Sequence, residues 1–389
     1  SINSFNNYKP GKAKQMVPCT PEGYVIGDVI LFYIAENTFN LVGRAPTLNW
    51  VMFHAETGDW DVTCTLDQRT AARPDKENRK SYRYQVQGPN AMKAMEKVLG
   101  QTPPDLKFFD MTEITIAGKT VGALRHGMAG QPGFELYGPW EDGKAVKEAL
   151  VAAGAEFGMR QVGGRTYASN TIESGWIPSP LPAIYTSDSL KAYREWLPAD
   201  GYEGSCSIGG SFVSDNIEDY YLTPWDLGYG FFVKFDHDFI GREALEKMAT
   251  AKKRKKVTLA LNDDDVAAVI MSQYGKDNER GKFIDFPSAV YSMHPFDKVM
   301  VDGKVIGLST WVAYTSNERK MLTLAMVDED FAEPGTEVVF VWGEENGGTR
   351  KPTVEPHKQM EIRAIVSPVP YVEVARTQYA GISGWREQA

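Results

Sequence analysis

The chain has 389 residues, of which 42% are hydrophobic and 24% charged, a composition typical of a folded protein with two or three packed lobes. Its net charge of −9 argues against a general nucleic-acid or anionic-membrane partner, because both require a basic face, and it contains no apolar run long enough to span a membrane. The cysteines Cys19, Cys64 and Cys206 are too few and too widely spaced for a disulfide framework, which favours a reducing, cytoplasmic location. A small molecule is the expected partner.

The first eighty residues are predicted from apolar periodicity and turn signals. In chain order, we expect a strand over 24–34, a turn at Glu36 and Asn37, a strand over 41–43, a helix from Pro46 to about Gly58, a strand over 60–66 (WDVTCTL), and a polar, charged loop over 67–80.

Residues 81–158 are predicted to form a sheet covered by two helices. Gly100 and Gly158 suit the ends of these helices, because glycine readily adopts the left-handed conformation of a helix stop. We expect a strand over 81–87, a helix from Pro89 with Met92, Met95 and Leu99 on one face, a hairpin over 113–127 that turns at Ala117 and Gly118, a strand over 133–139, and a helix from Glu141 with Val146, Leu150, Ala153 and Phe157 on one face.

The pattern changes after Lys252. Residues 251–256 (AKKRKK) are predicted to be a basic linker. Alternating strands are expected beyond it, at 257–261, 297–307 with a tight turn at Asp302 and Gly303, 321–327, 336–342 and 360–366. These strands indicate a separate β domain of barrel or sandwich type, whereas the preceding part is typical of an α+β layered core.

Several kinds of site have no motif in this sequence. The five histidines show neither HxH nor HExxH spacing, so we expect no metal site. Asn262 and the acidic residues after it are interpreted as a helix cap. The glycine-rich stretch at 207–211 lacks the lysine of a phosphate-binding loop.

Three residues are ambiguous on the sequence alone. Glu135 is a lone carboxylate in an apolar strand, where it either forms an ion pair with an arginine such as Arg125 or accepts hydrogen bonds from an N–H-rich heterocycle. Arg44 precedes a helix and either binds a substrate carboxylate or serves as an ion-pair partner. Trp176 is by default a packing aromatic.

The chain resembles the glycine-cleavage T-protein (aminomethyltransferase) superfamily of tetrahydrofolate enzymes nearly from end to end. The stretches that carry this resemblance are KAKQMVPCTPEGYVIGDVILFYIAENTFNLVGRAP, QVQGPNAM, GQPGFELYGP, TIESG, LTPWDLGYGFFVKFDHDFIGREAL and AIVSPVPY. Further stretches are similar to its tetrahydrofolate-dependent aryl O-demethylases, which include vanillate/3-O-methylgallate and syringate O-demethylases: RHGMAGQPG, ESGWIPSPLPAIYT, LKAYREWLPA and WGEENGGTRKPTVEPHKQM.

The resemblance implies an α+β, aminomethyltransferase-like fold of three lobes around a folate channel, with a C-terminal β-barrel. We expect a folate- and substrate-binding core of two interleaved lobes over 1–250, the barrel over 255–375 and a tail over 376–389. In the demethylases an N-terminal segment supplies part of the core and tyrosine, glutamine and histidine contacts to the substrate. That segment is expected to precede Ser1 and to be absent from this chain.

The resemblance also implies residue roles. Tyr167 matches the catalytic tyrosine of the demethylases, and its phenol suits proton exchange with an aryl oxide because the two groups have similar pKa values. Glu135 matches the acidic residue that binds the pterin ring of tetrahydrofolate. Trp176 matches an aromatic wall against substrate and folate, and Arg44 an arginine near the substrate carboxylate. The alternative for Tyr167 is a residue at a helix entry.

Two departures from the aminomethyltransferases bear on the chemistry. Those enzymes carry an acidic pair where this chain has Gly27 and Asp28, which argues against aminomethyl transfer. The stretch RTYASNTIESG around Tyr167 is longer than its counterpart. We therefore expect an O-demethylase that transfers the methyl group of a methoxybenzoate to tetrahydrofolate.

Two alternatives remain open, namely methyl transfer from a sulfonium donor and a non-catalytic folate-binding protein. A sulfonium compound leaves as a neutral thioether and needs no proton, so Tyr167 favours the aryl ether. The sequence does not decide the preferred methoxybenzoate, the oligomeric state, or the roles of Cys206 and the aromatic stretch 218–225.

Overall fold

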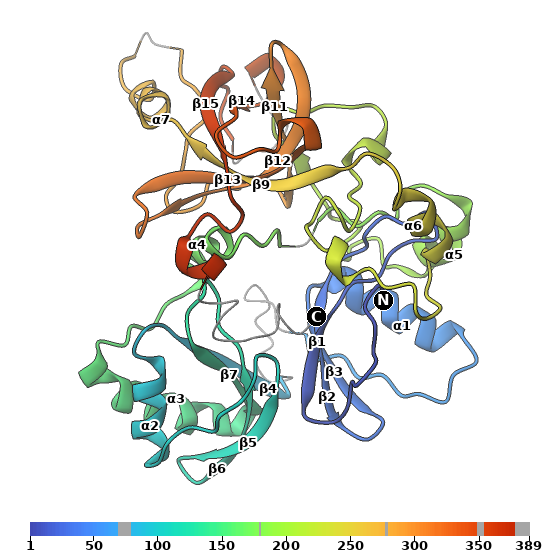
Figure 1. The fold of residues 1–389 in the computed structure, drawn as a ribbon, viewed down its shortest axis with the longest axis vertical. Helices are drawn as coiled ribbons and strands as arrows, with labels where there is room; N and C mark the ends of the chain where they lie inside the picture. The colour runs from blue at the N-terminus through green and yellow to red at the C-terminus, as the bar shows by residue number, and fades with distance from the viewer. Residues whose placement is uncertain (69–78, 179, 277–278, 348–353, 378–389) are drawn as a thin grey trace.

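A closed barrel forms one end of the molecule, and two antiparallel sheets lie at the other (Figure 1). The computed structural model describes residues 1–68, 79–178, 180–276, 279–347 and 354–377. The mixture of sheets and helices, together with the barrel, confirms the expected α+β class.

The first sheet is an antiparallel meander that carries one helix. It contains β1 (Lys12–Met16), β2 (Val29–Ala35) and β3 (Thr38–Gly43), and α1 (Ala45–Thr57) follows. The turn between β2 and β3 falls at Glu36 and Asn37, as expected, and Asn37 has a φ of 57°. The predicted helix from Pro46 is confirmed, whereas the predicted strand over 24–34 begins only at Val29.

The strand predicted over 60–66 is wrong. Its residues alternate as a half-buried strand would, but they pair with no strand among the described residues. Trp60 and Val62 are 68% and 58% exposed. An isolated extended segment gains neither ladder hydrogen bonds nor a buried face, so its pattern alone does not make a strand. Most of the loop predicted at 67–80 lies outside the described residues.

The second sheet has the order β4-β7-β6-β5 and is covered by two helices. Its strands are β4 (Ser81–Gln87), β5 (Met111–Ile116), β6 (Lys119–Arg125) and β7 (Gly133–Pro139), and its helices are α2 (Ala91–Leu99) and α3 (Gly143–Gly154). The hairpin between β5 and β6 turns at Ala117 and Gly118, as predicted. Gly100 and Gly158 adopt the left-handed conformation expected at the two helix ends. Met95, Ile116 and Leu136 are fully buried between the helices and the sheet.

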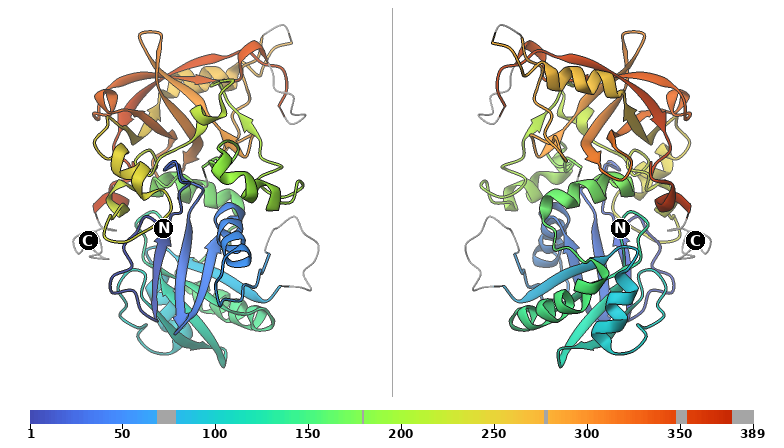
Figure 2. Two further views of the ribbon diagram at one scale, coloured as in Figure 1. Left: turned by 90° about the vertical axis from the view of Figure 1, so that its right-hand side faces the viewer. Right: turned by 90° about the vertical axis from the view of Figure 1, so that its left-hand side faces the viewer.

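A long segment of short elements, residues 155–178 and 180–253, is called the joining segment and connects the two sheets to the barrel (Figure 2). It contains α4 (Gly164–Ser174), α5 (Lys191–Trp196), α6 (Arg242–Met248) and the short strand β8 (Ile208–Gly209), which pairs in parallel with β10 (His294–Pro295). Turns of 3-10 helix occur at η2 (Trp140–Asp142), η3 (Ala155–Phe157), η4 (Asp188–Leu190), η5 (Ile217–Tyr220), η6 (Gly230–Phe232), η7 (Glu329–Phe331) and η8 (Glu345–Gly347).

The barrel closes in the order β11-β12-β13-β9-β15-β14. Its elements are β9 (Arg254–Leu261), α7 (Asp263–Met271), β11 (Asp297–Val301), β12 (Lys304–Thr315), β13 (Lys320–Asp328), β14 (Glu337–Trp342) and β15 (Met360–Ser367). Asn262 caps α7 by accepting a hydrogen bond from the Asp265 N–H at 3.0 Å, as predicted. The basic linker predicted over 251–256 is partly wrong, because Arg254 to Lys256 already pair with β13.

Two hydrophobic clusters meet at the barrel wall. The first lies within the barrel and includes the fully buried side chains of Leu259, Phe340 and Ile362. Leu324 and Met326 of β13 belong instead to a second cluster, together with Ile172 of α4 and Leu222 of the joining segment. The barrel wall is therefore also part of the core that supports α4.

Replacing Leu324 with alanine should lower the free energy of unfolding by about 2–5 kcal/mol, because the side chain is fully buried where the barrel meets α4. Urea denaturation measures the change. Ile365→Ala, on the same barrel but 41% exposed, serves as the control and should cost clearly less. Equal losses in the two variants would contradict this account of the core.

Candidate active site

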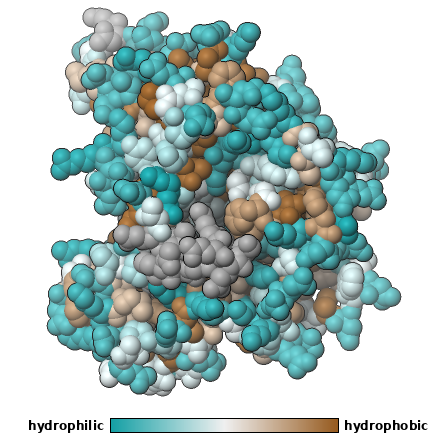
Figure 3. Space-filling view, in the orientation of Figure 1, coloured by the Kyte–Doolittle hydropathy of each residue, from teal (hydrophilic) through white to brown (hydrophobic). Residues whose placement is uncertain are grey.

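A cavity of about 1770 Å³ is lined by both sheets, α4 and the joining segment. All four residues that the sequence predicted for the site, Arg44, Glu135, Tyr167 and Trp176, line it. They come from the start of α1, from β7, from the first turns of α4 and from the residues just after α4. Figure 3 shows the surface in the orientation of Figure 1, with hydrophilic and hydrophobic residues interspersed over the barrel and the two sheets.

Tyr167 projects from α4 into this cavity and is 44% exposed. Its ring meets the Trp176 indole edge to face, with ring centroids 6.3 Å apart. Gly175 ends α4 in the left-handed conformation, which turns the chain so that Trp176 faces the same space. The two aromatic side chains therefore form one wall.

The hydroxyl of Tyr167 is held in its protonated form. The surrounding protein raises the pKa of Tyr167 to about 12, mainly through desolvation, while Arg44 opposes the shift and the negative charges of Asp28 and Glu135 add to it. At neutral pH this residue is therefore a proton donor and not a phenolate.

Arg44 lies exposed at the N-cap of α1. Among the described residues, no carboxylate forms an ion pair with its guanidinium. Its positive charge acts on Tyr167 and on Tyr202. A cation that has no carboxylate partner in the described ranges, beside tyrosine hydroxyls, suits a negatively charged ligand.

Glu135 is paired inside the cavity wall, with a side chain only 13% exposed. Its Oε1 accepts a hydrogen bond of 2.6 Å from Arg83 Nη1, and its Oε2 lies 3.6 Å from His126 Nδ1. Burial opposes ionisation, but His126 and Arg83 outweigh it and lower the pKa of Glu135 to about 2. The carboxylate is therefore ionised and oriented.

The suggested ion-pair partner, Arg125, is wrong. Arg125 donates to the Gly133 carbonyl oxygen at 2.8 Å, while Arg83 comes from β4, the strand directly beside β7. The guanidinium of Arg83 also lies over the rings of Phe32 and Tyr137, at 4.6 and 5.0 Å from their centroids. The partner was missed because strand pairing, and not sequence proximity, brings the two charges together.

Asp28 is a site residue that the sequence reasoning treated only as a departure from the family. It is 9% exposed, lines the cavity and lies immediately before β2 in the chain. Three side chains donate to its Oδ2, namely Gln15 Nε2 at 2.6 Å, Tyr229 Oη at 2.9 Å and Trp176 Nε1 at 3.1 Å. A carboxyl group with this many donors suggests a functional role, and the only signal in the sequence was an acidic residue next to a glycine.

Two opposing effects act on the pKa of Asp28. Desolvation raises the pKa of the carboxyl above its ordinary value, and the hydrogen bonds from Tyr229, Gln15 and Trp176 oppose that rise. Trp176 thus has a polar role besides forming the aromatic wall. A buried carboxyl with a raised pKa that lines a cavity is suited to exchange protons with a ligand.

The cavity has the features that a reduced pterin and an aromatic acid require. Ionised Glu135 is an acceptor for N–H groups, Tyr167 and Trp176 form an aromatic wall, and Arg44 is a cation. His126 Nδ1 is buried beside the same carboxylate, 3.6 Å from Glu135 Oε2. These residues fit a folate together with an anionic aromatic ligand.

Other candidate groups lie apart from this cavity. Cys206 Sγ lies 3.3 Å from His294 Nε2, and the pair does not line the cavity. Over the described ranges, no group of three or more histidine, cysteine, aspartate or glutamate side chains is arranged to hold a metal ion. None of the helices in those ranges is both long and apolar enough to cross a membrane.

Comparison with known sequences shows one family. Residues 1–179 match the model of the GCVT N-terminal domain. The chain is 64% identical over 385 residues to syringate O-demethylase from Sphingobium sp. (strain NBRC 103272 / SYK-6), a match that covers 99% of this chain and 82% of that protein. It is 30% identical to sesamin methylene transferase from Sinomonas sp. (strain No.22), with coverage of 96% and 80%.

A solved structure supports the fold. The crystal structure of the glycine cleavage system aminomethyltransferase T from Bartonella henselae matches with a TM-score of 0.58 and 18% identity, and the match covers 94% of this chain and 78% of that one. The aminomethyltransferase-like fold and the C-terminal barrel expected from the sequence are thereby confirmed.

Replacing Glu135 with glutamine should make the free energy of unfolding fall less steeply as the pH is lowered below 4.5. A carboxyl whose pKa falls from 4.5 to about 2 on folding stabilises the protein above pH 4.5, and this contribution is lost as the pH falls toward 2. The wild type should lose roughly 3 kcal/mol over that range through this group. Urea denaturation from pH 6 to pH 2 should show a shallower fall for Glu135→Gln, and Glu148→Gln, which is exposed, should follow the wild type.

Proposed function

This chain belongs to the GCVT family of folate-dependent transferases, in the branch that contains syringate O-demethylase, and we propose that it transfers the methyl group of a methoxybenzoate to tetrahydrofolate. The products are a phenol and 5-methyltetrahydrofolate. Syringate is the first candidate substrate because the relative that acts on it shares 64% of the residues over nearly the whole chain.

The observation that carries the proposal is that Tyr167, Trp176 and Arg44 line one cavity, with Tyr167 in contact with Trp176 and under the influence of the Arg44 charge. Tyr167 is protonated at neutral pH, is open to the cavity and is edge to face with an indole. An aromatic acid stacked in this space presents its ring to the aromatic wall and its carboxylate to the Arg44 guanidinium. This combination suits a charged aryl substrate.

Tyr167 is the proposed general acid. Breaking the bond between the methyl carbon and the aryl oxygen places negative charge on that oxygen, and a positioned hydroxyl stabilises it by donating a hydrogen bond and then a proton. A sulfonium donor would leave as a neutral thioether and have no use for this proton. The protonated tyrosine therefore favours an aryl ether as methyl donor.

Glu135, Trp176 and Asp28 are the residues proposed to hold tetrahydrofolate. When bound, tetrahydrofolate supplies the nitrogen that accepts the methyl group. Glu135, fixed by Arg83, would accept N–H bonds from the pterin ring, since it remains ionised across the physiological pH range. Trp176 would cover a ring face, and Asp28 would receive the proton released when N–H becomes N–CH₃.

A cytoplasmic location fits this proposal. The cysteines Cys19, Cys64 and Cys206 are all free, which is the usual state in a reducing compartment. A supply of reduced folate and of lignin-derived aromatic acids would be needed there.

The direct test is product analysis. The protein is mixed with tetrahydrofolate and, separately, with syringate, vanillate and 3-O-methylgallate, and folate products are separated by mass. We expect 5-methyltetrahydrofolate with at least one of them, syringate first. Transfer of a methylene group in place of a methyl group to the folate would indicate chemistry like that named for the Sinomonas relative. Tight folate binding without any product would contradict the proposal and favour a folate-binding protein.

Tyr167→Phe should lower kcat by about 10²–10⁴-fold, because it removes the general acid but keeps the aromatic ring. Its affinity for tetrahydrofolate, measured by calorimetry, should be close to that of the wild type. Tyr291→Phe is a matched control, since the pKa of Tyr291 is also raised to about 12 but the residue packs against the hydrophobic cluster of the barrel and does not line the cavity. Unchanged turnover in Tyr167→Phe would exclude this role.

A further inference from the structure

The hydrogen bonds around Asp28 converge on one of its two oxygens. Gln15, Tyr229 and Trp176 all donate to Oδ2. The second oxygen, Oδ1, has no hydrogen-bond partner among the described residues and does not belong to their buried unpartnered atoms, so it is open to the cavity that Asp28 lines. Hydrogen bonds therefore hold the carboxylate by Oδ2, and Oδ1 faces the cavity.

The direction of each bond follows from the donors. Trp176 Nε1 carries one hydrogen and has no acceptor capacity, and it lies 2.9 Å from Tyr229 Oη as well as 3.1 Å from Asp28 Oδ2. Gln15 Nε2 likewise lies 2.9 Å from Tyr229 Oη. An amide oxygen in its place would face a carboxylate oxygen, so the amino group is the one that points inward.

The Tyr229 hydroxyl has one acceptor for its own hydrogen, Asp28 Oδ2 at 2.9 Å. Its oxygen accepts from Gln15 Nε2, and the single hydrogen of Trp176 Nε1 is shared between this oxygen and Asp28 Oδ2. A proton on Oδ2 would displace the Tyr229 hydrogen, which has no other acceptor among the described residues. Oδ1 is therefore the favoured position for the proton of a neutral Asp28.

We propose that Tyr229 is a positioning residue that reserves Oδ2 of Asp28 for hydrogen bonding, so that proton exchange with a bound ligand takes place at Oδ1 alone. This inference rests on the proposed function for its catalytic consequence. Tyr229 does not touch the reacting atoms; it acts through Asp28.

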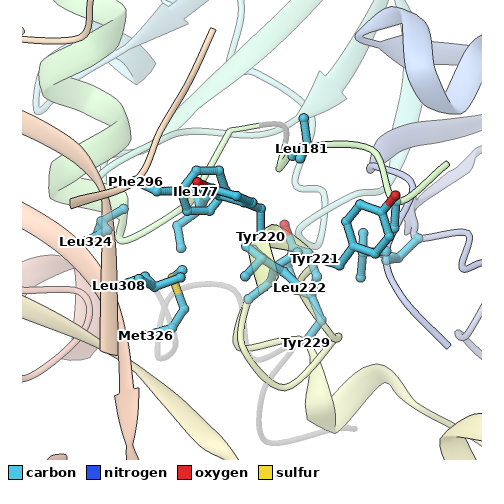
Figure 4. Close-up of a cluster of buried hydrophobic side chains, with 14 of the residues drawn as sticks. Ile177, Leu181, Tyr220, Tyr221, Leu222, Tyr229, Phe296, Leu308, Leu324 and Met326 are labelled. Atoms are coloured by element: carbon cyan, nitrogen blue, oxygen red, sulfur yellow. The ribbon is translucent and has the colours of Figure 1, made fainter. Parts of the chain in front are cut away.

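The placement of Tyr229 is rigid. The residue is 6% exposed, and its backbone N–H donates to the Pro224 carbonyl oxygen at 2.7 Å. Figure 4 shows it in the buried cluster with Leu222 and Tyr221. On the preceding residue, a Cβ would lie 2.7 Å from Lys256 Cε, so Gly228 permits the barrel to pack closely here. Contacts from both the joining segment and the barrel therefore fix the position of Tyr229.

The charged and titratable groups that face Asp28 come from several elements. Tyr229 lies in the joining segment, and Lys256 of β9 acts on Asp28 and lies 5.9 Å from the centroid of the Tyr229 ring. Tyr167 lines the same cavity, and the charge of Asp28 acts on it. Gln15 of β1 and Trp176 contribute neutral donors. Lys256 favours the ionised carboxylate, whereas burial disfavours it.

The proton balance of methyl transfer requires an acceptor at this position. The aryl ether loses its methyl group and its oxygen gains a proton from Tyr167, while the accepting nitrogen gains the methyl group and loses its hydrogen. If Oδ1 receives that hydrogen, solvent later reprotonates Tyr167 and deprotonates Asp28, and no further co-reactant is needed. In one turnover, Tyr167 therefore gives up a proton and Asp28 takes one up.

The test is Tyr229→Phe, examined in two ways. Without ligand, the titration of Asp28 is followed by carboxyl carbon NMR on aspartate-labelled protein, with Asp28→Asn to assign the signal. Loss of a donor to the ionised form should raise the pKa of Asp28 by about one to two units. With substrates, the acidic limb of kcat/KM should move to higher pH by the same amount, while the rate above the limb stays within a few fold of wild type.

Tyr185→Phe is the matched control. Its hydroxyl also belongs to a partly buried tyrosine packed on the same cluster, but it donates to the Glu203 carbonyl oxygen and not to Asp28. It should leave both the Asp28 titration and the pH profile in place. A similar shift in Tyr185→Phe would mean that general loosening of the core, and not the lost donor, moves the titration.

The two readouts separate failure of this inference from failure of the proposed function. If the NMR titration of Asp28 is unchanged in folded Tyr229→Phe, the inference is wrong whatever the enzyme catalyses. If the titration shifts but the wild type makes no 5-methyltetrahydrofolate, the positioning stands and the proposed function falls. A shifted titration with an unmoved acidic limb in an active enzyme would remove Asp28 from the proton transfer and overturn the catalytic part.

Discussion

The site depends on keeping one carboxylate, Asp28, ionisable in a buried place. Burial alone would make the charged form costly, so three donors must meet at a single oxygen. These donors come from β1, from the joining segment and from the residue after Gly175. Because an unsatisfied buried carboxylate is costly, these hydrogen bonds hold the three segments together and orient them around one cavity.

The barrel supports this arrangement from outside. One face of β13 packs inside the barrel, while Leu324 and Met326 pack against α4 and the joining segment. Lys256 reaches from β9 toward the Tyr229 ring. A helix that carries the proposed general acid thus rests on a rigid wall, which suits chemistry that needs fixed distances between donor, substrate and acceptor.

Charge pairing divides the cavity into two kinds of group. Glu135 is fixed by Arg83 and near His126, so it is ionised and can serve only as an acceptor. Arg44 has no carboxylate partner among the described residues, and Tyr167 keeps its proton. An anionic aromatic ligand is complementary to the cation of such a cavity, and a heterocycle rich in N–H groups is complementary to its ionised carboxylate. The electrostatic pattern thereby agrees with the family to which the chain belongs.

The sequence by itself determined the class, most of the regular elements and, through the family resemblance, four of the residues that line the cavity, because periodicity, turn residues and motifs are local. It failed at residues 60–66, where a strand pattern lacks a pairing partner among the described residues, and at residues 254–256, where strand pairing extends into a basic run. Only the tertiary structure decided that Glu135 pairs with Arg83 and that Asp28 is the centre of a donor cluster. The reason is distance along the chain: Gln15 and Tyr229 are 214 positions apart, and only folding brings both to the same carboxylate oxygen.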